Sequence, residues 1–272
     1  MKRNVPVLVL TGFGLNCDHE TAHAFELAGA TARRVHINSL IDRSATLEDF
    51  QILAFGGGFS WGDDHGAGVI QAVRMKTRLG DDLLRFVEAG KLVIGICNGF
   101  QTLVNLGLLP GVDGDYRTRS VALTHNDCGN FRDQWVRLRV NTASPCVFTK
   151  GIAAMDLPVR HGEGKFYAAD GMLSRLRDNQ QVVLQYADAD GLPAGRRFPA
   201  NPNGSLLDAA GICDASGRVF GLMPHPEAFH HPTHHPQWTR RKELARRRGA
   251  GWEEEIETGL TIFRNAVRHV SG

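Results

Sequence analysis

The first hundred residues alternate short apolar runs with segments whose apolar residues recur at helical spacing. The apolar runs predict β-strands, and the segments between them predict helices. Strands are expected at Val5–Leu10, Arg33–Ile37, Gln51–Phe55 and Lys91–Ile96, and helices at Glu20–Leu27, Ala67–Leu79 and Asp81–Glu88. Nearly continuous apolar strands joined by helices are typical of a parallel sheet that is covered on both faces.

After Gly111 the pattern changes to short strands joined by turns, which predicts a mixed, partly antiparallel extension of the sheet. These strands are expected at Trp135–Val140, Val159–Phe166, Val182–Tyr186, Gly211–Asp214 and Val219–Met223. The Pro-, Gly- and Asn-rich stretch Gly191–Gly204 is interpreted as a loop rather than a linker. We therefore expect one α/β domain over residues 1–272.

A cysteine between two glycines stands where a predicted strand meets a predicted helix, in the run Gly95–Gly99. This pattern is typical of a nucleophile elbow, a tight turn that tolerates only small neighbours and projects the reactive side chain. The N-terminus of the following helix favours the thiolate form of Cys97. Taken alone, the same pattern fits a buried structural cysteine on a turn equally well.

A second motif near the C-terminus favours the catalytic interpretation. A cysteine nucleophile needs a base and an orienting partner for that base, and His225 and Glu227 provide both just after a predicted strand. Pro224 and Pro226 flank the histidine and restrict its backbone. The alternative is an ordinary turn histidine in a His-rich loop, but only His225 is framed in this way and followed by an acid.

Three loops follow predicted parallel strands, namely Gly12–Asp18, Gly56–Asp64 and the turn at Cys97. Because active sites in such sheets lie beyond the carboxyl ends of the strands, we expect these loops to converge at one edge.

Composition narrows the remaining classes of function. The 272 residues carry a net charge of +2, which argues against general nucleic-acid binding. The five cysteines are scattered without a Cys-x-x-Cys pair, no leader peptide is expected, and no apolar run approaches membrane-spanning length. These features favour a cytoplasmic protein. Prolines interrupt the histidines of residues 225–235, so no functional metal site is expected there.

Taken together, the motifs resemble those of the class I glutamine amidotransferases, and most closely the glutaminase subunit of phosphoribosylformylglycinamidine synthase. The resemblance covers nearly the whole chain, and its motifs keep their expected order. Beyond the Cys97 and His225 motifs it rests on Gly14–Asp18, Gly56–Asp64, Arg160–Phe166, Asn201–Ser205 and Gly259–Ala266.

The resemblance implies a flavodoxin-like three-layer sandwich with a mostly parallel central sheet and a mixed or antiparallel extension. It implies hydrolysis of glutamine to glutamate and ammonia by Cys97, His225 and Glu227. The backbone N–H groups of Asn98 and Gly58, with Gly57 as the next choice, would form the oxyanion hole.

The segments that would contact the substrate match the family pattern less fully than the catalytic motifs do. The loop His125–Phe131, including Asn126 and Phe131, should hold the backbone end of glutamine, but it departs from the family pattern, which carries Ser and Arg near the positions of Cys128 and Asn130. Gln101 lies one helical turn after Cys97 and would contact the substrate or serve in capping and packing. His161 and Glu163 form a second His/acid pair that would line the pocket or face a partner.

The chain carries no ATP-binding signature. The resemblance therefore implies a separate synthetase subunit that binds formylglycinamide ribonucleotide, ATP and magnesium, with no cofactor in this chain, and also a small bridging subunit.

The competing hypotheses are the glutaminase subunit of another class I amidotransferase, a stand-alone Cys-His hydrolase, and a catalytically inactive regulatory subunit. The tail, basic over 239–248 and acidic over 253–257, is interpreted as a solvated helical hairpin, with a docking surface as the alternative.

Overall fold

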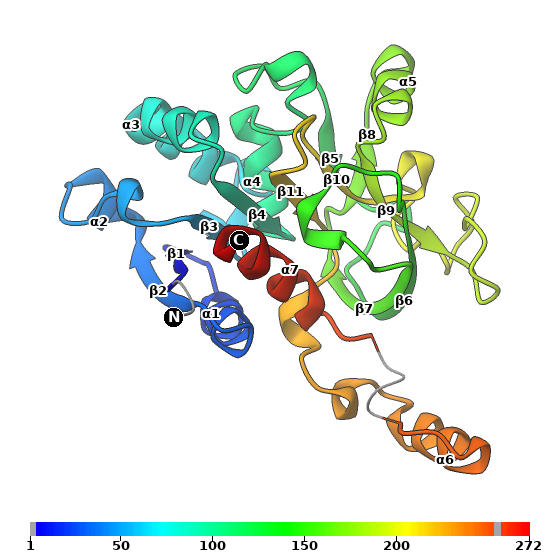
Figure 1. Cartoon of the computed structure of the whole chain (residues 1–272). Coiled ribbons are helices and arrows are strands. Elements are labelled where there is room, and N and C mark those ends of the chain that lie inside the picture. Colours follow the sequence, from blue (N-terminus) through cyan, green and yellow to red (C-terminus); the bar gives the residue numbers. More distant parts are fainter. Residues whose placement is uncertain (1–3, 253–256) are drawn as a thin grey trace.

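Nine strands form one sheet in the computed structural model, which describes residues 4–252 and 257–272. The order across the sheet is β2-β1-β3-β4-β11-β10-β9-β6-β7, and a separate two-stranded sheet pairs β5 with β8 (Figure 1). The strands are β1 Pro6–Thr11, β2 Thr31–His36, β3 Ile52–Phe55, β4 Leu92–Ile96, β5 Ala122–Thr124, β6 Arg132–Val140, β7 Ala154–His161, β8 Lys165–Tyr167, β9 Val182–Ala187, β10 Ala209–Cys213 and β11 Val219–Leu222.

The first five positions of the order are parallel to one another, and the other four join them as antiparallel neighbours. The predicted parallel sheet with an antiparallel extension is therefore confirmed. β3 and β4 are buried along their whole length, which explains why their sequences are continuously apolar.

Helices cover both faces of the sheet and complete a three-layer sandwich. α1 and α7 pack on one face, where the rings of Phe25 and Phe263 meet edge to face at 4.9 Å, whereas α3 and α4 pack together on the other (Figure 1). The helices are α1 Asp18–Leu27, α2 Ile37–Ile41, α3 Val69–Glu88, α4 Asn98–Leu106, α5 Asp170–Asp178, α6 Trp238–Arg248 and α7 Leu260–Ser271.

Two predicted elements differ from the structure. The segments Ala67–Leu79 and Asp81–Glu88 form the single helix α3, which continues through Gly80. The strand expected at Val159–Phe166 is wrong, because β7 ends at His161 and the chain turns before β8. The turn requires Gly164, where a Cβ atom would lie 2.4 Å from the His161 ring.

The basic part of the tail forms α6, which projects from the body of the protein (Figure 1). Residues 253–256 of the predicted acidic arm lie outside the described residues, so the hairpin stays a prediction. Among the described helices, none combines the length and the apolar character needed to cross a lipid bilayer.

Candidate active site

Cys97 occupies a strained turn between β4 and α4. Its backbone has φ 52° and ψ −106°, a conformation that non-glycine residues rarely adopt, and its N–H donates to Leu222 O at 2.8 Å. The flanking glycines are required by close packing, since a Cβ at Gly99 would lie 2.1 Å from Phe55 O and one at Gly95 would lie 2.6 Å from the Leu103 side chain. The sulfur is thereby held at the N-terminal end of α4.

His225 and Glu227 follow β11, the parallel neighbour of β4. Leu222 pairs with Ile96 in the register of these strands, so Cys97 and His225 emerge at the same edge of the sheet. His225 Nδ1 lies 2.5 Å from Glu227 Oε1, and each residue is only 2% exposed. The backbone N–H of His225 donates to Pro158 O at 2.8 Å and anchors this loop to β7.

The surroundings of His225 favour its protonated form. Burial lowers the pKa of the imidazole, but the Glu227 carboxylate and the sulfurs of Cys97 and Cys17 outweigh burial and hold the pKa well above its usual value. His225 Nε2 has no hydrogen-bond partner in residues 4–252 and 257–272, and the Cys97 thiol donates to Arg160 O at 3.6 Å. The imidazole is therefore oriented by Glu227, while Nε2 remains available to exchange a proton.

The glycine loop after β3 contains Gly57 and Gly58, both predicted for the oxyanion hole, and the two residues contact different parts of the site. Gly58 has φ 146° and lines the cavity at Cys97, and a Cβ there would lie 2.6 Å from Gly14 O. Gly57 packs instead against the imidazole, since its Cβ would lie 2.8 Å from His225 Cε1. Asn98 is the first residue of α4, where backbone N–H groups have no partner within the helix. Gly58 thus lines the cavity at the sulfur, and Asn98 follows Cys97 directly in the chain, while the oxyanion hole itself stays a prediction.

Cys17 belongs to the site, although nothing in the sequence beyond its loop after β1 placed it there. Ligand atoms of Cys17, His225 and Glu227 all lie within 4.8 Å of one another. Burial raises the pKa of the Cys17 thiol, and its contact with His225 acts in the opposite direction. A cation bound by this group would have to displace the short bond between His225 and Glu227, so we assign no metal to it. The other histidines of residues 225–235 form no comparable group in the described part of the chain.

A cavity of about 310 Å³ opens at the Cys97 sulfur. Its walls come from the glycine loop, the start of α4 and the turn after β7. It is lined by Gly58, Phe59, Gly62, Asp63, Ala67, Cys97, Gln101, Phe131, Arg160, His161, Gly162 and Glu163.

The three predicted substrate-binding residues differ in their relation to this cavity. Gln101 and Phe131 line it, and Gln101 Nε2 donates to Glu163 O at 2.5 Å. Asn126 is not among the lining residues. Its Nδ2 donates to Asn130 O at 3.0 Å and to His161 O at 2.8 Å, so its amide holds the wall of the cavity together. Substrate contact by these residues stays a prediction.

His161 is buried beside Cys97 in a fixed tautomer. Asn126 Nδ2 donates to two carbonyls, so Asn126 Oδ1 is the acceptor for His161 Nδ1 at 3.2 Å, and His161 Nδ1 carries the proton. Burial and the nearby His225 lower the pKa of His161 to about 3. His161 Nε2 is therefore an unprotonated acceptor, and it has no partner among the described residues. The lowered pKa makes His161 a much weaker base than His225 at neutral pH.

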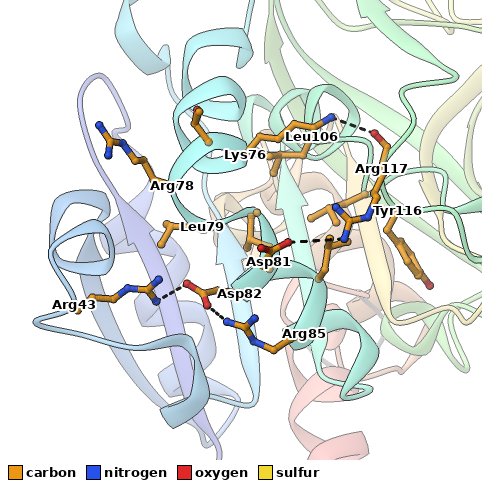
Figure 2. A pocket seen from close by; sticks show the side chains of 15 residues that line it. Arg43, Lys76, Arg78, Leu79, Asp81, Asp82, Arg85, Leu106, Tyr116 and Arg117 are labelled. Carbon is orange, nitrogen blue, oxygen red and sulfur yellow. Dashed lines mark hydrogen bonds and ion pairs between the residues drawn. The ribbon is translucent and has the colours of Figure 1, made fainter.

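A second cavity, of about 270 Å³, lies along α3 and is lined by neither cysteine nor histidine among the described residues. Figure 2 shows that its charged side chains largely face one another. Asp82 pairs with Arg43 at 2.5 Å and with Arg85, and Lys76 Nζ donates to Arg117 O at 3.1 Å. These internal pairs leave this cavity without the groups that glutamine hydrolysis requires.

Known proteins that are similar to this chain are glutamine amidotransferases. Residues 4–270 match the model of the CobB/CobQ-like glutamine amidotransferase domain. The chain is 47% identical to phosphoribosylformylglycinamidine synthase subunit PurQ of Methanococcus maripaludis, over 97% of this chain and 96% of the relative. It is also 47% identical to the subunit PurQ of Dehalococcoides mccartyi, over 97% of both chains.

Among solved structures, a chain of PurLQS from Thermotoga maritima superposes with a TM-score of 0.69 and 28% identity, over 99% of this chain and 100% of that chain. The family match, the identities and the three-layer fold agree with the resemblance inferred from the motifs. The chain belongs to the CobB/CobQ-like glutamine amidotransferase family and, within it, to the PurQ subunits of phosphoribosylformylglycinamidine synthase.

Proposed function

We propose that this chain is the glutaminase subunit that hydrolyses glutamine to glutamate and ammonia for phosphoribosylformylglycinamidine synthase. The ammonia is delivered to a separate ATP-dependent synthetase subunit, which converts formylglycinamide ribonucleotide to formylglycinamidine ribonucleotide. The observation that carries the proposal is the strained Cys97 turn, which lies at the same sheet edge as the buried His225–Glu227 pair.

The reaction begins when the Cys97 thiolate attacks the side-chain carbonyl carbon of glutamine. His225 accepts the thiol proton and passes it to the departing nitrogen, while Glu227 fixes the imidazole and stabilises its protonated form. The N–H groups of Asn98 and Gly58 stabilise the tetrahedral oxyanion. Water, activated by the same imidazole, then cleaves the thioester, so that glutamine and water yield glutamate and ammonia.

The partners follow from the relatives. The similar chain from Thermotoga maritima belongs to a structure of PurLQS, which supports a synthetase partner and a small bridging subunit for this chain. Phe59 and Phe131 are about half exposed where they line the cavity, their rings 6.3 Å apart, and such apolar side chains fit a surface that a partner covers. ATP and magnesium are proposed to bind the synthetase and not this chain.

The five free cysteines and the role in nucleotide synthesis support a cytoplasmic location. A different synthase partner is the remaining alternative, and it would use the same catalytic residues.

The experiment measures glutamate release by this chain alone and after addition of the synthetase and bridging subunits from the same genome, with formylglycinamide ribonucleotide and ATP present. We expect slow hydrolysis by the lone chain and a rise of at least about tenfold in the complex, because the partner orders the active site. Equal rates would contradict the proposed dependence on these partners.

A further inference from the structure

Two carboxylates line the cavity at Cys97 without a role in the reaction described above. Asp63 lies at the end of the short 3-10 helix Ser60–Asp63 that follows β3, and Glu163 lies in the turn that follows β7. Elements far apart in the sequence thus place two acids in one small cavity.

Neither acid has a strong positive partner within the described residues. Glu163 Oε2 accepts from Ala67 N at 3.2 Å, and Nδ1 of the exposed His125 lies 3.9 Å from Glu163 Oε1. The donors to Asp63 are neutral, namely Asn98 Nδ2 at 3.1 Å from Oδ1 and the backbone N–H of Gly68. Burial raises the pKa of Asp63, and the charge of Glu163 raises it further. A cation bound between these two carboxylates would relieve that repulsion.

An unpaired acceptor in the wall of the same cavity independently indicates that the ligand supplies a hydrogen-bond donor. His161 is 3% exposed, lines this cavity, and keeps Nε2 as an unprotonated acceptor without a partner in the described part of the chain. Buried acceptors without a donor are rare in folded proteins. The ligand of this cavity should therefore carry several N–H donors and a positive charge.

The cavity also has one cationic wall residue. Arg160 lines it and is about half exposed, and its nearest acid is Asp133, at 3.9 Å. Two acids and one guanidinium match an amino acid, which carries one ammonium and one carboxylate group.

We propose that Asp63 and Glu163 bind the α-ammonium group of glutamine and thereby make the cavity specific for an amino acid rather than for a simple amide. This inference rests on the proposed glutaminase function and names the residues that recognise its substrate. Arg160, in the same cavity, faces the α-carboxylate, and the side-chain amide extends to Cys97.

The test compares Asp63→Asn and Glu163→Gln with the unchanged protein in the assembled complex. Both variants keep the acceptor oxygens used by Asn98 and Ala67 and remove only the charge, and Asn is well tolerated at the positive φ of residue 63, 56°. The substrates are L-glutamine and glutaramate, which is glutamine without its α-amino group. Where turnover of glutaramate is too slow to measure, its inhibition constant against L-glutamine replaces KM.

We expect each variant to raise KM for L-glutamine about 10- to 100-fold with little change in kcat, because a hydrogen bond to a charged group is lost. The constants for glutaramate should stay within about twofold, because that molecule never makes the contact. Asp64→Asn is the matched control, since Asp64 is exposed and does not line the cavity. This substitution should leave the kinetic constants for both substrates unchanged.

Equal losses for L-glutamine and glutaramate would overturn the inference, since they would indicate a structural role. Unchanged constants for L-glutamine would overturn it as well. Failure of the proposed function is a separate result, because the unchanged complex would then fail to hydrolyse L-glutamine at all.

Discussion

His225 Nδ1 lies 2.5 Å from Glu227 Oε1 in a pocket that excludes almost all solvent from both side chains. A charge-assisted hydrogen bond of this length fixes the ring and its tautomer. It also directs Nε2 away from Glu227, and Nε2 has no hydrogen-bond partner among the described residues. The contact therefore orients the base, and the Glu227 charge is the largest of the causes that raise its pKa.

Replacing the acid tests that relationship. Glu227→Gln keeps the shape of the side chain and removes the charge that, together with the sulfurs of Cys97 and Cys17, outweighs burial of the imidazole. We expect kcat to fall about 10²- to 10⁴-fold, and the alkaline limb of the kcat/KM profile to move to lower pH, because burial then lowers the pKa of His225. The measurement is glutaminase activity of the complex from pH 6 to pH 10. A small loss of rate with an unmoved limb would show that Glu227 does not control the base.

Close packing at the elbow predicts a strong effect of Gly99→Ala. The new Cβ would lie 2.1 Å from Phe55 O, a backbone atom that cannot move aside without shifting β3. We expect a loss of about 2 kcal/mol or more in the free energy of unfolding, together with loss of glutaminase activity.

The matched control for this change is Gly80→Ala, within α3, where no atom lies within 4 Å of the new Cβ. That variant should gain about 0.4–1 kcal/mol, because alanine is the better helix former. Denaturant unfolding of both variants tests the pair, and equal destabilisation would refute the packing argument.

Gly56 and Gly57 differ in how closely they approach His225, so we expect alanine substitutions at these two positions to differ in their effect on kcat. A Cβ at Gly57 would lie 2.8 Å from His225 Cε1, whereas one at Gly56 would meet its nearest atom at 3.6 Å, an ordinary contact. Gly57→Ala should therefore displace the imidazole and lower kcat about tenfold or more, while Gly56→Ala should leave kcat within about twofold. Steady-state kinetics with glutamine gives the comparison. Similar values for the two variants would mean that Gly57 does not limit the position of the ring.

The buried His161 predicts a specific dependence of stability on pH. Its pKa is about 3 in the folded protein and about 6.5 in the unfolded chain, so the unfolded chain binds an additional proton between these values. The free energy of unfolding should fall as the pH drops below about 6.5, by about 2 kcal/mol at pH 5 from this residue. His225, whose pKa is raised in the folded protein, contributes a slope of opposite sign near pH 7, and this contribution fades as the pH falls below about 6.5, because the unfolded chain then also binds this proton.

His161→Gln should reduce that slope, whatever its effect on absolute stability. His65→Gln, a change at an exposed residue, should leave the slope unaltered. Urea unfolding at pH 5, 6 and 7 measures both. If His161→Gln retains the full slope, then His161 does not stay neutral in the folded protein.

The sequence predicted the parallel half of the sheet well, because fully buried strands such as β4 are apolar along their whole length. It also predicted the convergence of the Cys97 turn with the loops after β1 and β3, since parallel strands end at a common edge. It failed where tertiary contacts decide the local structure. The chain turns after His161 because Gly164 must fit over the imidazole, and no local pattern reveals that contact.

The two acids of the cavity differ in how far the sequence predicted them. Glu163 was expected with His161 to line the pocket or to face a partner, and both residues line the cavity. Asp63 belongs to a predicted active-edge loop but is one of several polar residues there, and no local pattern distinguishes it. The substrate contact that the resemblance implies for Asn126 stays a prediction. The structure adds what the sequence did not indicate, namely that its amide bonds to Asn130, His161 and Gly164.

The central claim is that Cys97 releases the ammonia that the synthetase uses. The most direct test measures formation of formylglycinamidine ribonucleotide by the assembled complex, with glutamine or ammonium as nitrogen donor, for the unchanged chain and for Cys97→Ala. We expect Cys97→Ala to lower the glutamine-dependent rate at least about 10³-fold and to leave the ammonium-dependent rate unchanged. Persistence of the glutamine-dependent rate in Cys97→Ala would contradict the claim, because the nucleophile would then be another residue.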